Sequence, residues 1–185
     1  MKEIRMHGRG GQGSFAAAEI LAVAAFEDGK ISQAFPSFGS ERMGAPIQTF
    51  VRLSDRKIRS RNHIYEPDYV VIMDPTLIID IDVLKGMKSG GLVLVNTEKK
   101  PEELKFKSEL DFDQIRVIPA TRIAREITGK AIPNAVMMGA FAGFTKEVSI
   151  AAIKRAVMER FPGKVGELNA QGAKKAYSMI KEGEK

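Results

Sequence analysis

The chain has 185 residues, of which 44% are hydrophobic and 28% are charged. This length and composition predict one soluble globular domain with a full core. Cysteine is absent, which excludes thiolate-ligated iron–sulfur clusters, disulfides and a thiol nucleophile in this chain. Any redox chemistry must therefore reside on a bound cofactor or on another chain.

No signal-like segment opens the sequence and no apolar run is long enough to span a bilayer, so we expect a cytoplasmic protein without a membrane partner.

The formal net charge of +6 fits nucleic acid, an anionic ligand or an acidic partner subunit. Basic residues do not alternate with aromatic ones as they do in single-strand binding platforms, so we expect no nucleic-acid partner. His7 and His63 have no neighbours at metal-ligand spacing, and we assign no metal site. The many Lys, Arg and Glu residues would suit a thermophile, and equally an ordinary soluble protein.

A glycine-rich stretch follows the first expected strand, residues 3–7. Its glycines stand at the spacing of the G-x-G-x-x-G pattern, between that strand and an alanine-rich helix expected over 14–27. Glycine lets the main chain turn sharply, and the free N–H groups at a helix N-terminus attract phosphate. The pattern predicts a phosphate site, although a tight turn alone would use the same glycines. The stretch consists of Gly8, Arg9, Gly10, Gly11, Gln12 and Gly13.

The segment after the first helix departs from a dinucleotide-binding unit. Such a unit needs a second strand that ends in an acidic residue for the ribose hydroxyls, whereas residues 30–35 are short and lead into a loop without that carboxylate. This argues against a nicotinamide site. The loop, PSFGSERMGAP at 36–46, is rich in turn residues. Its Arg42, beside Glu41, either binds phosphate or carboxylate through the planar guanidinium or is solvated on a surface loop.

A hairpin is expected next, because residues 47–53 alternate as a strand, 54–55 can turn and 57–60 can return. Basic residues gather in this region against a single acid, Asp55. They form either a docking face for an acidic partner or solvated charges that blunt a sheet edge. These basic residues are Arg52, Arg56, Lys57, Arg59 and Arg61.

The continuous apolar run at 69–74 predicts a central strand covered on both faces, and residues 92–96 predict the next buried strand. Residues 115–119 predict a further short strand. Alternation of strands and helices predicts an α/β fold: a three-layer, Rossmann-like single domain over 1–185, with a mainly parallel sheet and an antiparallel hairpin. Ligands of such sheets bind beyond the carboxyl ends of the strands, where the glycine stretch must lie. Asn134, at the start of an apolar helix, can cap that helix or present its amide to a site.

Three stretches together resemble the gamma subunit of 2-oxoacid:ferredoxin oxidoreductases, the pyruvate and 2-ketoisovalerate enzymes in particular. They are residues 8–13, PSFGSERMGAP at 36–46 and IPNAVMMGAF at 132–141. The resemblance covers nearly the whole chain. It implies a subunit without catalytic residues of its own, in an enzyme that converts a 2-oxoacid such as pyruvate, coenzyme A and oxidised ferredoxin to an acyl-CoA, CO2 and reduced ferredoxin. The implied partners are alpha, beta and delta subunits, with ferredoxin reached through the holoenzyme.

The resemblance also implies which chain holds each cofactor. Thiamine diphosphate with Mg2+ belongs to the alpha and beta subunits and the 4Fe–4S clusters to the beta and delta subunits, which agrees with a gamma chain that lacks cysteine. The gamma chain itself is expected to pack on the thiamine-diphosphate subunits and to contribute to the coenzyme A site. The residues expected to contact coenzyme A are those of the glycine stretch together with Ser37, Phe38, Gly39, Glu41, Arg42 and Asn134.

Three other interpretations stay open. Within the same family, the glycine stretch can be structural while the 36–46 loop contacts a neighbouring subunit near the thiamine site. Outside it, the chain can be a stand-alone nucleotide-binding Rossmann-like oxidoreductase domain, or a purely structural assembly subunit. The preferred 2-oxoacid is not encoded here, because that pocket is expected to belong mainly to other chains.

Overall fold

The computed structural model describes residues 1–37 and 43–183. Within them, six strands form one sheet: β1 (Lys2–Arg9), β2 (Ile31–Pro36), β3 (Pro46–Ser54), β4 (Tyr69–Ile72), β5 (Leu92–Asn96) and β6 (Ile115–Ile118). Their order across the sheet is β2-β3-β1-β4-β5-β6. Strands β1, β4, β5 and β6 are parallel neighbours, whereas β3 runs antiparallel to both β1 and β2. The predicted α/β fold, with a mainly parallel sheet and an antiparallel hairpin, is confirmed.

The hairpin has a different partner from the one that the sequence suggested. Strand β3 pairs along its length with β2, from Ile31 opposite Ser54 to Pro36 opposite Thr49, and residues 57–60 form no strand. The expectation was wrong because the buried Arg52 guanidinium takes the carbonyls of the returning segment. It donates to Ser60 O at 3.5 Å and to Asn62 O at 2.7 Å, so that segment bonds to a side chain instead of to a strand.

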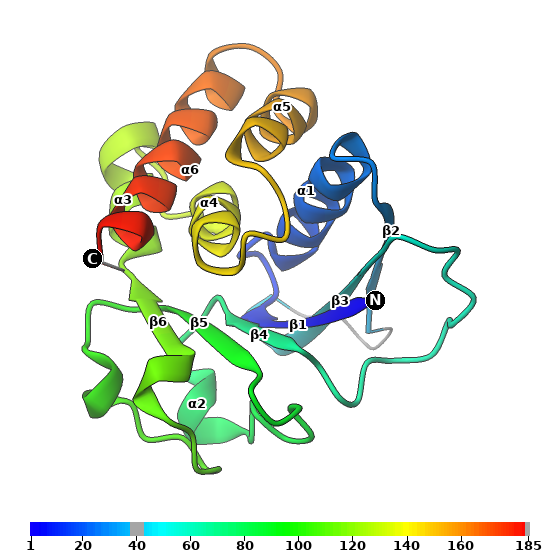
Figure 1. Ribbon diagram of the computed structural model, residues 1–185. Coiled ribbons are helices and arrows are strands. Elements are labelled where there is room, and N and C mark those ends of the chain that lie inside the picture. Colours follow the sequence, from blue (N-terminus) through cyan, green and yellow to red (C-terminus); the bar gives the residue numbers. More distant parts are fainter. Residues whose placement is uncertain (38–42, 184–185) are drawn as a thin grey trace.

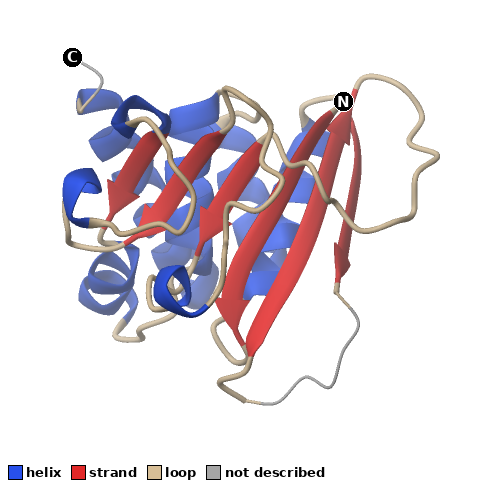
Figure 2. Ribbon diagram, turned by 90° about the horizontal axis from the view of Figure 1, so that it is seen from below, coloured by secondary structure: helices blue, strands red, loops and turns tan. Residues whose placement is uncertain are grey.

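The helices divide unequally between the two faces of the sheet (Figures 1 and 2). One face carries α1 and the group α3 to α6, while the other carries only the short α2, 3-10 turns and loops. The described helices are α1 (Ser14–Glu27), α2 (Leu77–Asp80), α3 (Ala120–Thr128), α4 (Asn134–Thr145), α5 (Ile150–Arg160) and α6 (Lys164–Glu182), with 3-10 turns at η1 (Pro101–Glu103) and η2 (Phe112–Gln114). None of them is long and apolar enough to cross a membrane.

The main core lies between the sheet and the larger helical layer, with α4 at its centre. Every residue of α4 from Asn134 to Phe144 is buried, which explains why this segment is apolar around its whole circumference. Gly139 lies against the backbone of Ala173 in α6, so closely that a Cβ at position 139 would collide with the Ala173 carbonyl. The glycine therefore sets the distance between α4 and α6.

On the opposite face, β1 carries two buried titratable side chains. The Arg5 guanidinium donates to the carbonyls of Val83, at 3.1 Å, and Lys85, at 2.7 Å, and its Nε donates to His7 Nε2 at 3.1 Å. These bonds hold the segment 81–87 over the sheet. They also account for the short α2, because Ile81 is extended and the carbonyls of Val83 and Lys85 bond to Arg5 instead of continuing the helix.

Candidate functional site

The candidate site lies at the carboxyl ends of β1 and β4. From β1 the chain passes through α1 on one face of the sheet, whereas from β4 it passes into α2 on the other face (Figure 1). The chain then continues toward opposite edges of the sheet, to β2 in one case and β5 in the other. Such a reversal point is where open α/β sheets bind their ligands. The glycine stretch lies there, as the sequence predicted.

The glycine stretch divides between strand and turn. Gly8 and Arg9 complete β1, so the loop proper comprises residues 10–13, and α1 begins at Ser14. Gly8 lies directly under the Ser14 hydroxyl, where a Cβ would collide with it. Gly13 has φ 75° and serves as the N-cap of α1, a conformation that favours glycine. The motif thus packs the helix closely on the strand and reverses the chain between them.

The turn also brings the second predicted stretch to the same place. Gly10 N donates to Ala45 O at 3.0 Å and Gly44 N donates to Gly10 O at 3.1 Å. At the other end of that loop, Ser37 N donates to Gln48 O at 2.9 Å and closes the hairpin. The structure therefore joins the end of the PSFGSERMGAP loop to the glycine turn. The predicted site residues Phe38, Gly39, Glu41 and Arg42 lie outside the described residues.

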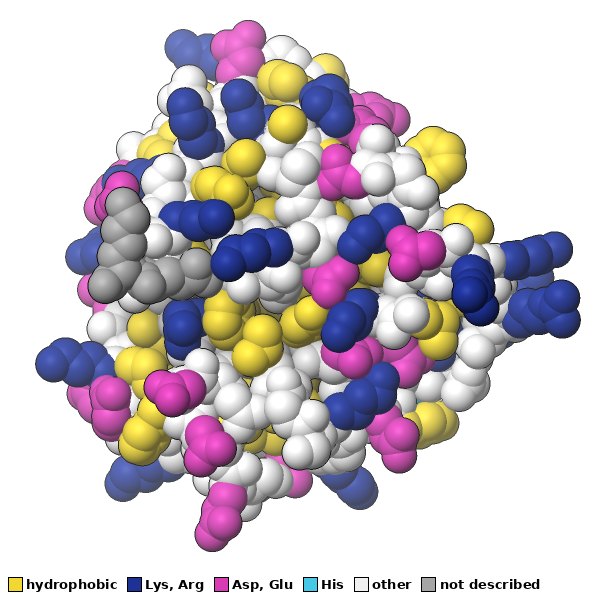
Figure 3. Space-filling view, viewed as in Figure 1, with side chains coloured by type: hydrophobic (Ala, Val, Ile, Leu, Met, Phe, Trp, Pro, Cys, Tyr) yellow, Lys and Arg dark blue, Asp and Glu magenta, His cyan; other side chains and the backbone are white. Residues whose placement is uncertain are grey.

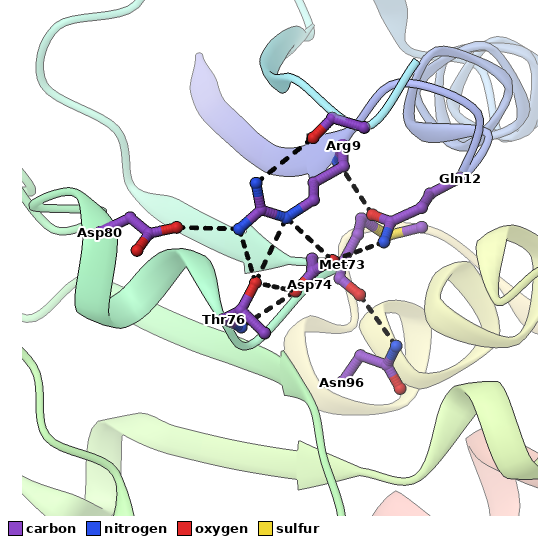
Figure 4. A network of polar contacts seen from close by, with 8 residues as sticks. Arg9, Gln12, Met73, Asp74, Thr76, Asp80 and Asn96 are labelled. Carbon is purple, nitrogen blue, oxygen red and sulfur yellow. Dashed lines mark hydrogen bonds and ion pairs between the residues drawn. The ribbon is translucent and has the colours of Figure 1, made fainter.

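A network of polar side chains lies at the carboxyl ends of β1 and β4 (Figure 4). Gln12 Nε2 donates to Asp74 Oδ2 at 2.6 Å, and Gln12 Oε1 accepts from Arg9 N at 2.9 Å. The Arg9 guanidinium donates to Thr76 Oγ1 at 2.7 Å and to Asp80 Oδ2 at 2.8 Å, and its Nε lies 3.4 Å from Asp74 Oδ2. Arg9 and Gln12 therefore both have partners inside this chain.

Electrostatics stabilise this network in its ionised form. Partial burial acts to raise the pKa of Asp74, but hydrogen bonds from Thr76 and Gln12 and the nearby Arg9 charge together hold that pKa below its usual value. Asn96, at the end of β5, extends the network: its Nδ2 donates to Met73 O at 2.9 Å and to Thr121 Oγ1 at 2.8 Å. The carboxyl ends of β1, β4 and β5 are thus tied together.

Beside this network, the first turn of α1 presents unpaired backbone donors. Among the described residues, none accepts a hydrogen bond from the amides of Ser14, Phe15 or Ala16; the first helical bond runs from Ala17 N to Gly13 O at 3.0 Å. Gly13 supplies no capping side chain, and the first turn contains no acidic residue. This arrangement suits an anion, because the donors and the positive end of the helix dipole point the same way.

A cavity of about 360 Å3 adjoins that turn on the helical face of the sheet. Gly11, Gly13 and Ala16 form one side of it, and residues from the end of α3, the α3–α4 connection, the start of α4, the α5–α6 connection and the first turns of α6 form the rest. The lining is mainly apolar, with Lys130 and two asparagines among the exceptions. The lining residues from these other elements are Thr128, Lys130, Ile132, Asn134, Phe161, Val165, Leu168 and Asn169.

Asn134 connects the cavity to the glycine turn. It is the first residue of α4, with Pro133 in the N-cap position, and its Oδ1 accepts from the adjacent Ala135 N at 2.7 Å. A Cβ on Gly13 would lie 2.8 Å from Asn134 Nδ2. No described residue accepts a hydrogen bond from this Nδ2, although the side chain is almost completely buried. Asn134 is therefore a cavity residue with a free donor rather than a conventional helix cap.

Sequence reasoning missed the far wall of the cavity. Lys130, Phe161 and Leu168 stand more than 100 residues after the glycine turn, and their sequence neighbourhoods carry no motif. The available signal was that Lys130 stands two residues before the IPNA segment at 132–135, which contains Asn134. Among residues 1–37 and 43–183 no group of His, Asp and Glu side chains could hold a metal ion.

Comparison with known proteins identifies the family. Residues 3–179 match the model of the pyruvate ferredoxin/flavodoxin oxidoreductase family. The chain is 51% identical over 181 residues to pyruvate synthase subunit PorC of Methanosarcina barkeri, covering 98% of each chain. It is 48% identical over 178 residues to the pyruvate/ketoisovalerate oxidoreductases common subunit gamma of Thermococcus kodakarensis, covering 96% of each.

Solved structures agree with these relationships. The crystal structure of pyruvate oxidoreductase subunit PORC from Thermotoga maritima superimposes with a TM-score of 0.80 at 34% identity, over 96% of this chain and 95% of that one. The 2-oxoglutarate:ferredoxin oxidoreductase of Magnetococcus marinus, at 20% identity and a TM-score of 0.72, shares the fold over 31% of its own chain. The chain belongs to the pyruvate ferredoxin/flavodoxin oxidoreductase family, in which its whole length corresponds to the gamma subunit of the multi-subunit enzymes.

Proposed function

We propose that this gamma-type subunit contributes part of the coenzyme A site in a complex that converts pyruvate, coenzyme A and oxidised ferredoxin to acetyl-CoA, CO2 and reduced ferredoxin. The observation that carries the proposal is the mainly apolar cavity beside the unpaired first-turn amides of α1. Coenzyme A combines phosphates with a long, largely uncharged arm, and the two halves of this site match that combination. The structure of the Magnetococcus marinus relative, which is described with coenzyme A bound, supports the proposal by analogy.

The residues divide into contacting and positioning groups under this proposal. The amides of Ser14, Phe15 and Ala16 bind phosphate oxygens, and Lys130 and the free Nδ2 of Asn134 add donors at the cavity wall. Arg9 and Gln12 already bond to Asp74, so their proposed role is to hold the glycine turn in place without contacting the ligand. Ser37, Phe38, Gly39, Glu41 and Arg42 belong to a loop whose far end is joined to Gly10, and Arg42 completes the proposed phosphate contacts.

The remaining chemistry is proposed for other subunits. Thiamine diphosphate and Mg2+ are held by alpha and beta chains, and 4Fe–4S clusters by beta and delta chains that pass electrons to ferredoxin. Gamma packs on the thiamine-diphosphate subunits. The absence of cysteine from this sequence supports this assignment of the clusters to other chains, because protein-bound clusters are held by thiolates.

Coenzyme A binding to the purified complex tests the proposal. We expect Lys130→Ala and Arg42→Ala each to weaken binding about ten- to hundredfold, since losing a hydrogen bond to a charged group costs roughly 1.5–3 kcal/mol. Lys174→Ala is the matched control, because Lys174 is exposed on α6 and has no ion-pair partner among the described residues. Size-exclusion chromatography checks that each variant complex stays assembled.

The alternative is a purely structural gamma subunit. The network at the carboxyl ends of β1 and β4 favours it, because Arg9 and Gln12 already bond to side chains of this chain. If coenzyme A affinity is unchanged in both variants while the complex remains intact, this chain makes no contact with the phosphates and the proposal fails. If the variants instead release gamma from the complex, the turn and the loop are assembly elements.

A further inference from the structure

The loop that joins β3 to β4 concentrates the positive charge of the molecule. Residues 55–62 hold four cations, Arg56, Lys57, Arg59 and Arg61, and one acid, Asp55, a net of +3 and half of the chain's formal +6. All four cationic residues are exposed. None of them forms a side-chain hydrogen bond or ion pair with any described residue. Lys and Arg side chains project over this loop at the right of Figure 3.

The base of this basic loop (residues 55–62) is held rigidly. Arg52, which is only 1% exposed, donates to the carbonyls of Ser60 and Asn62 and forms an ion pair with Glu3 at 2.9 Å. Its guanidinium also lies over the Phe35 ring at 5.2 Å from the centroid. A buried guanidinium thus fixes part of the backbone of a loop whose own cations have no side-chain partner among the described residues. Such pre-organisation lowers the entropy cost of binding a partner.

Other cations at the same edge of the sheet are neutralised within the chain. Lys88 bonds to Asp68 at 2.9 Å and lies 3.7 Å from Glu3, and Lys2 lies 3.9 Å from Asp68. Lys2 and Lys88 therefore add little unpaired charge beside the loop. Because Ser54 and Leu53 lie beside the start of β1, the basic loop leaves from the amino ends of the parallel strands, opposite the glycine turn. It is separate from the proposed coenzyme A site.

We propose that the basic loop is a docking element for a carboxylate-rich surface on a partner subunit of the same complex. The family relationship makes a neighbouring protein chain the natural occupant, and four exposed cations on one loop are complementary to clustered Asp and Glu side chains. Charge complementarity of this kind accelerates association and selects the partner's orientation. The inference depends on membership of the complex and not on coenzyme A binding.

The test measures binding of the gamma chain to the immobilised complex of the remaining subunits. The loop variant R56A/K57A/R59A/R61A is compared with the control K85A/R125A/K164A/K174A, which removes four exposed cations elsewhere on the surface. At about 0.1 M salt we expect the loop variant to associate at least about tenfold more slowly than the control, as loss of steering predicts. At about 1 M salt, where the Debye length is about 3 Å, the difference should disappear.

Several results would overturn the proposal. Equal association rates for loop variant and control at low salt would show that the loop does not meet the partner. If the loop variant loses binding to a DNA or RNA duplex that the control variant retains, while both associate equally with the other subunits, the loop would be assigned to nucleic acid instead. The coenzyme A affinity of the complex assembled with the loop variant should equal that of the parent complex. The docking proposal and the coenzyme A proposal can therefore be refuted independently. Circular dichroism confirms that the variant is folded.

Discussion

His7 shows how far burial can shift a single side chain from its usual behaviour. It is 1% exposed, and its Nδ1 has no hydrogen-bond partner among the described residues. Burial and the adjacent Arg5 charge lower the pKa of His7 to about 3. His7 is therefore neutral at physiological pH, with Nε2 free to accept from Arg5, and it belongs to the support of the sheet rather than to the candidate site.

This shift predicts a pH-dependent stability. Between pH of about 6.5 and about 3 the unfolded chain binds a proton at His7 that the folded chain does not, so the free energy of unfolding falls as pH decreases, by up to about 1.4 kcal/mol per pH unit. His7→Gln retains an acceptor for Arg5 and should remove this component of the slope. Urea titrations at pH 7, 6 and 5 measure this slope. Identical slopes in parent and variant would refute the assignment.

The roles of Arg9 and Gln12 mark the limit of inference from residue types. Their place in a G-x-G-x-x-G stretch predicts contact with phosphate, and nothing near them in sequence indicated the partners that they have within the chain. Their partner Asp74 stands more than 60 residues later and reaches them only because β4 lies beside β1. A motif specifies backbone geometry well, since glycine conformation is local, whereas the direction of its polar side chains depends on tertiary contacts.

Among the secondary-structure elements, the contact between α4 and α6 is the most sharply defined. In a solvent-exposed helix, replacing glycine by alanine stabilises the helix by up to about 1 kcal/mol. Gly139→Ala should do the opposite, because its Cβ would collide with the Ala173 carbonyl in α6; we expect a loss of about 1–3 kcal/mol, or about 2–12 °C in Tm. Gly183→Ala, whose Cβ would have ordinary contacts, is the control. Equal Tm values for the two variants would contradict close packing here.

The elements also show which patterns are reliable. Strands β4 and β5 were predicted from their apolar runs, because strands covered on both faces are apolar along most of their length. The hairpin partner of β3 was mispredicted because a turn-like Ser54-Asp55 made a local return plausible. The observed partner β2 precedes β3, across a loop whose length gives no pairing signal.

For the molecule as a whole, family and fold were accessible from the sequence, and the cavity was not. Three local motifs sufficed for the family, since each occupies a contiguous stretch. The cavity beside α1 is assembled from the end of α3, the start of α4, the α3–α4 and α5–α6 connections and the first turns of α6, so its lining depends on how the helices pack. Exposed apolar side chains such as Met43, Ile79 and Val165 remain at the surface, as expected of a chain that belongs to a complex.

Assembly should therefore raise the stability of this chain, and α4 is the place to measure it. Its amides are buried in the main core, so they exchange with solvent only when the whole domain opens. At partner concentrations of about 100 times Kd, binding adds about 2.7 kcal/mol, which should slow exchange of these amides about 100-fold relative to the isolated chain. Hydrogen-exchange mass spectrometry resolves this chain's peptides from those of its partners. Equal exchange rates of the α4 amides in the isolated and assembled chain would mean that assembly does not stabilise the fold. If the α4 amides of the isolated chain exchange completely within the dead time, its core is not stable without the partners.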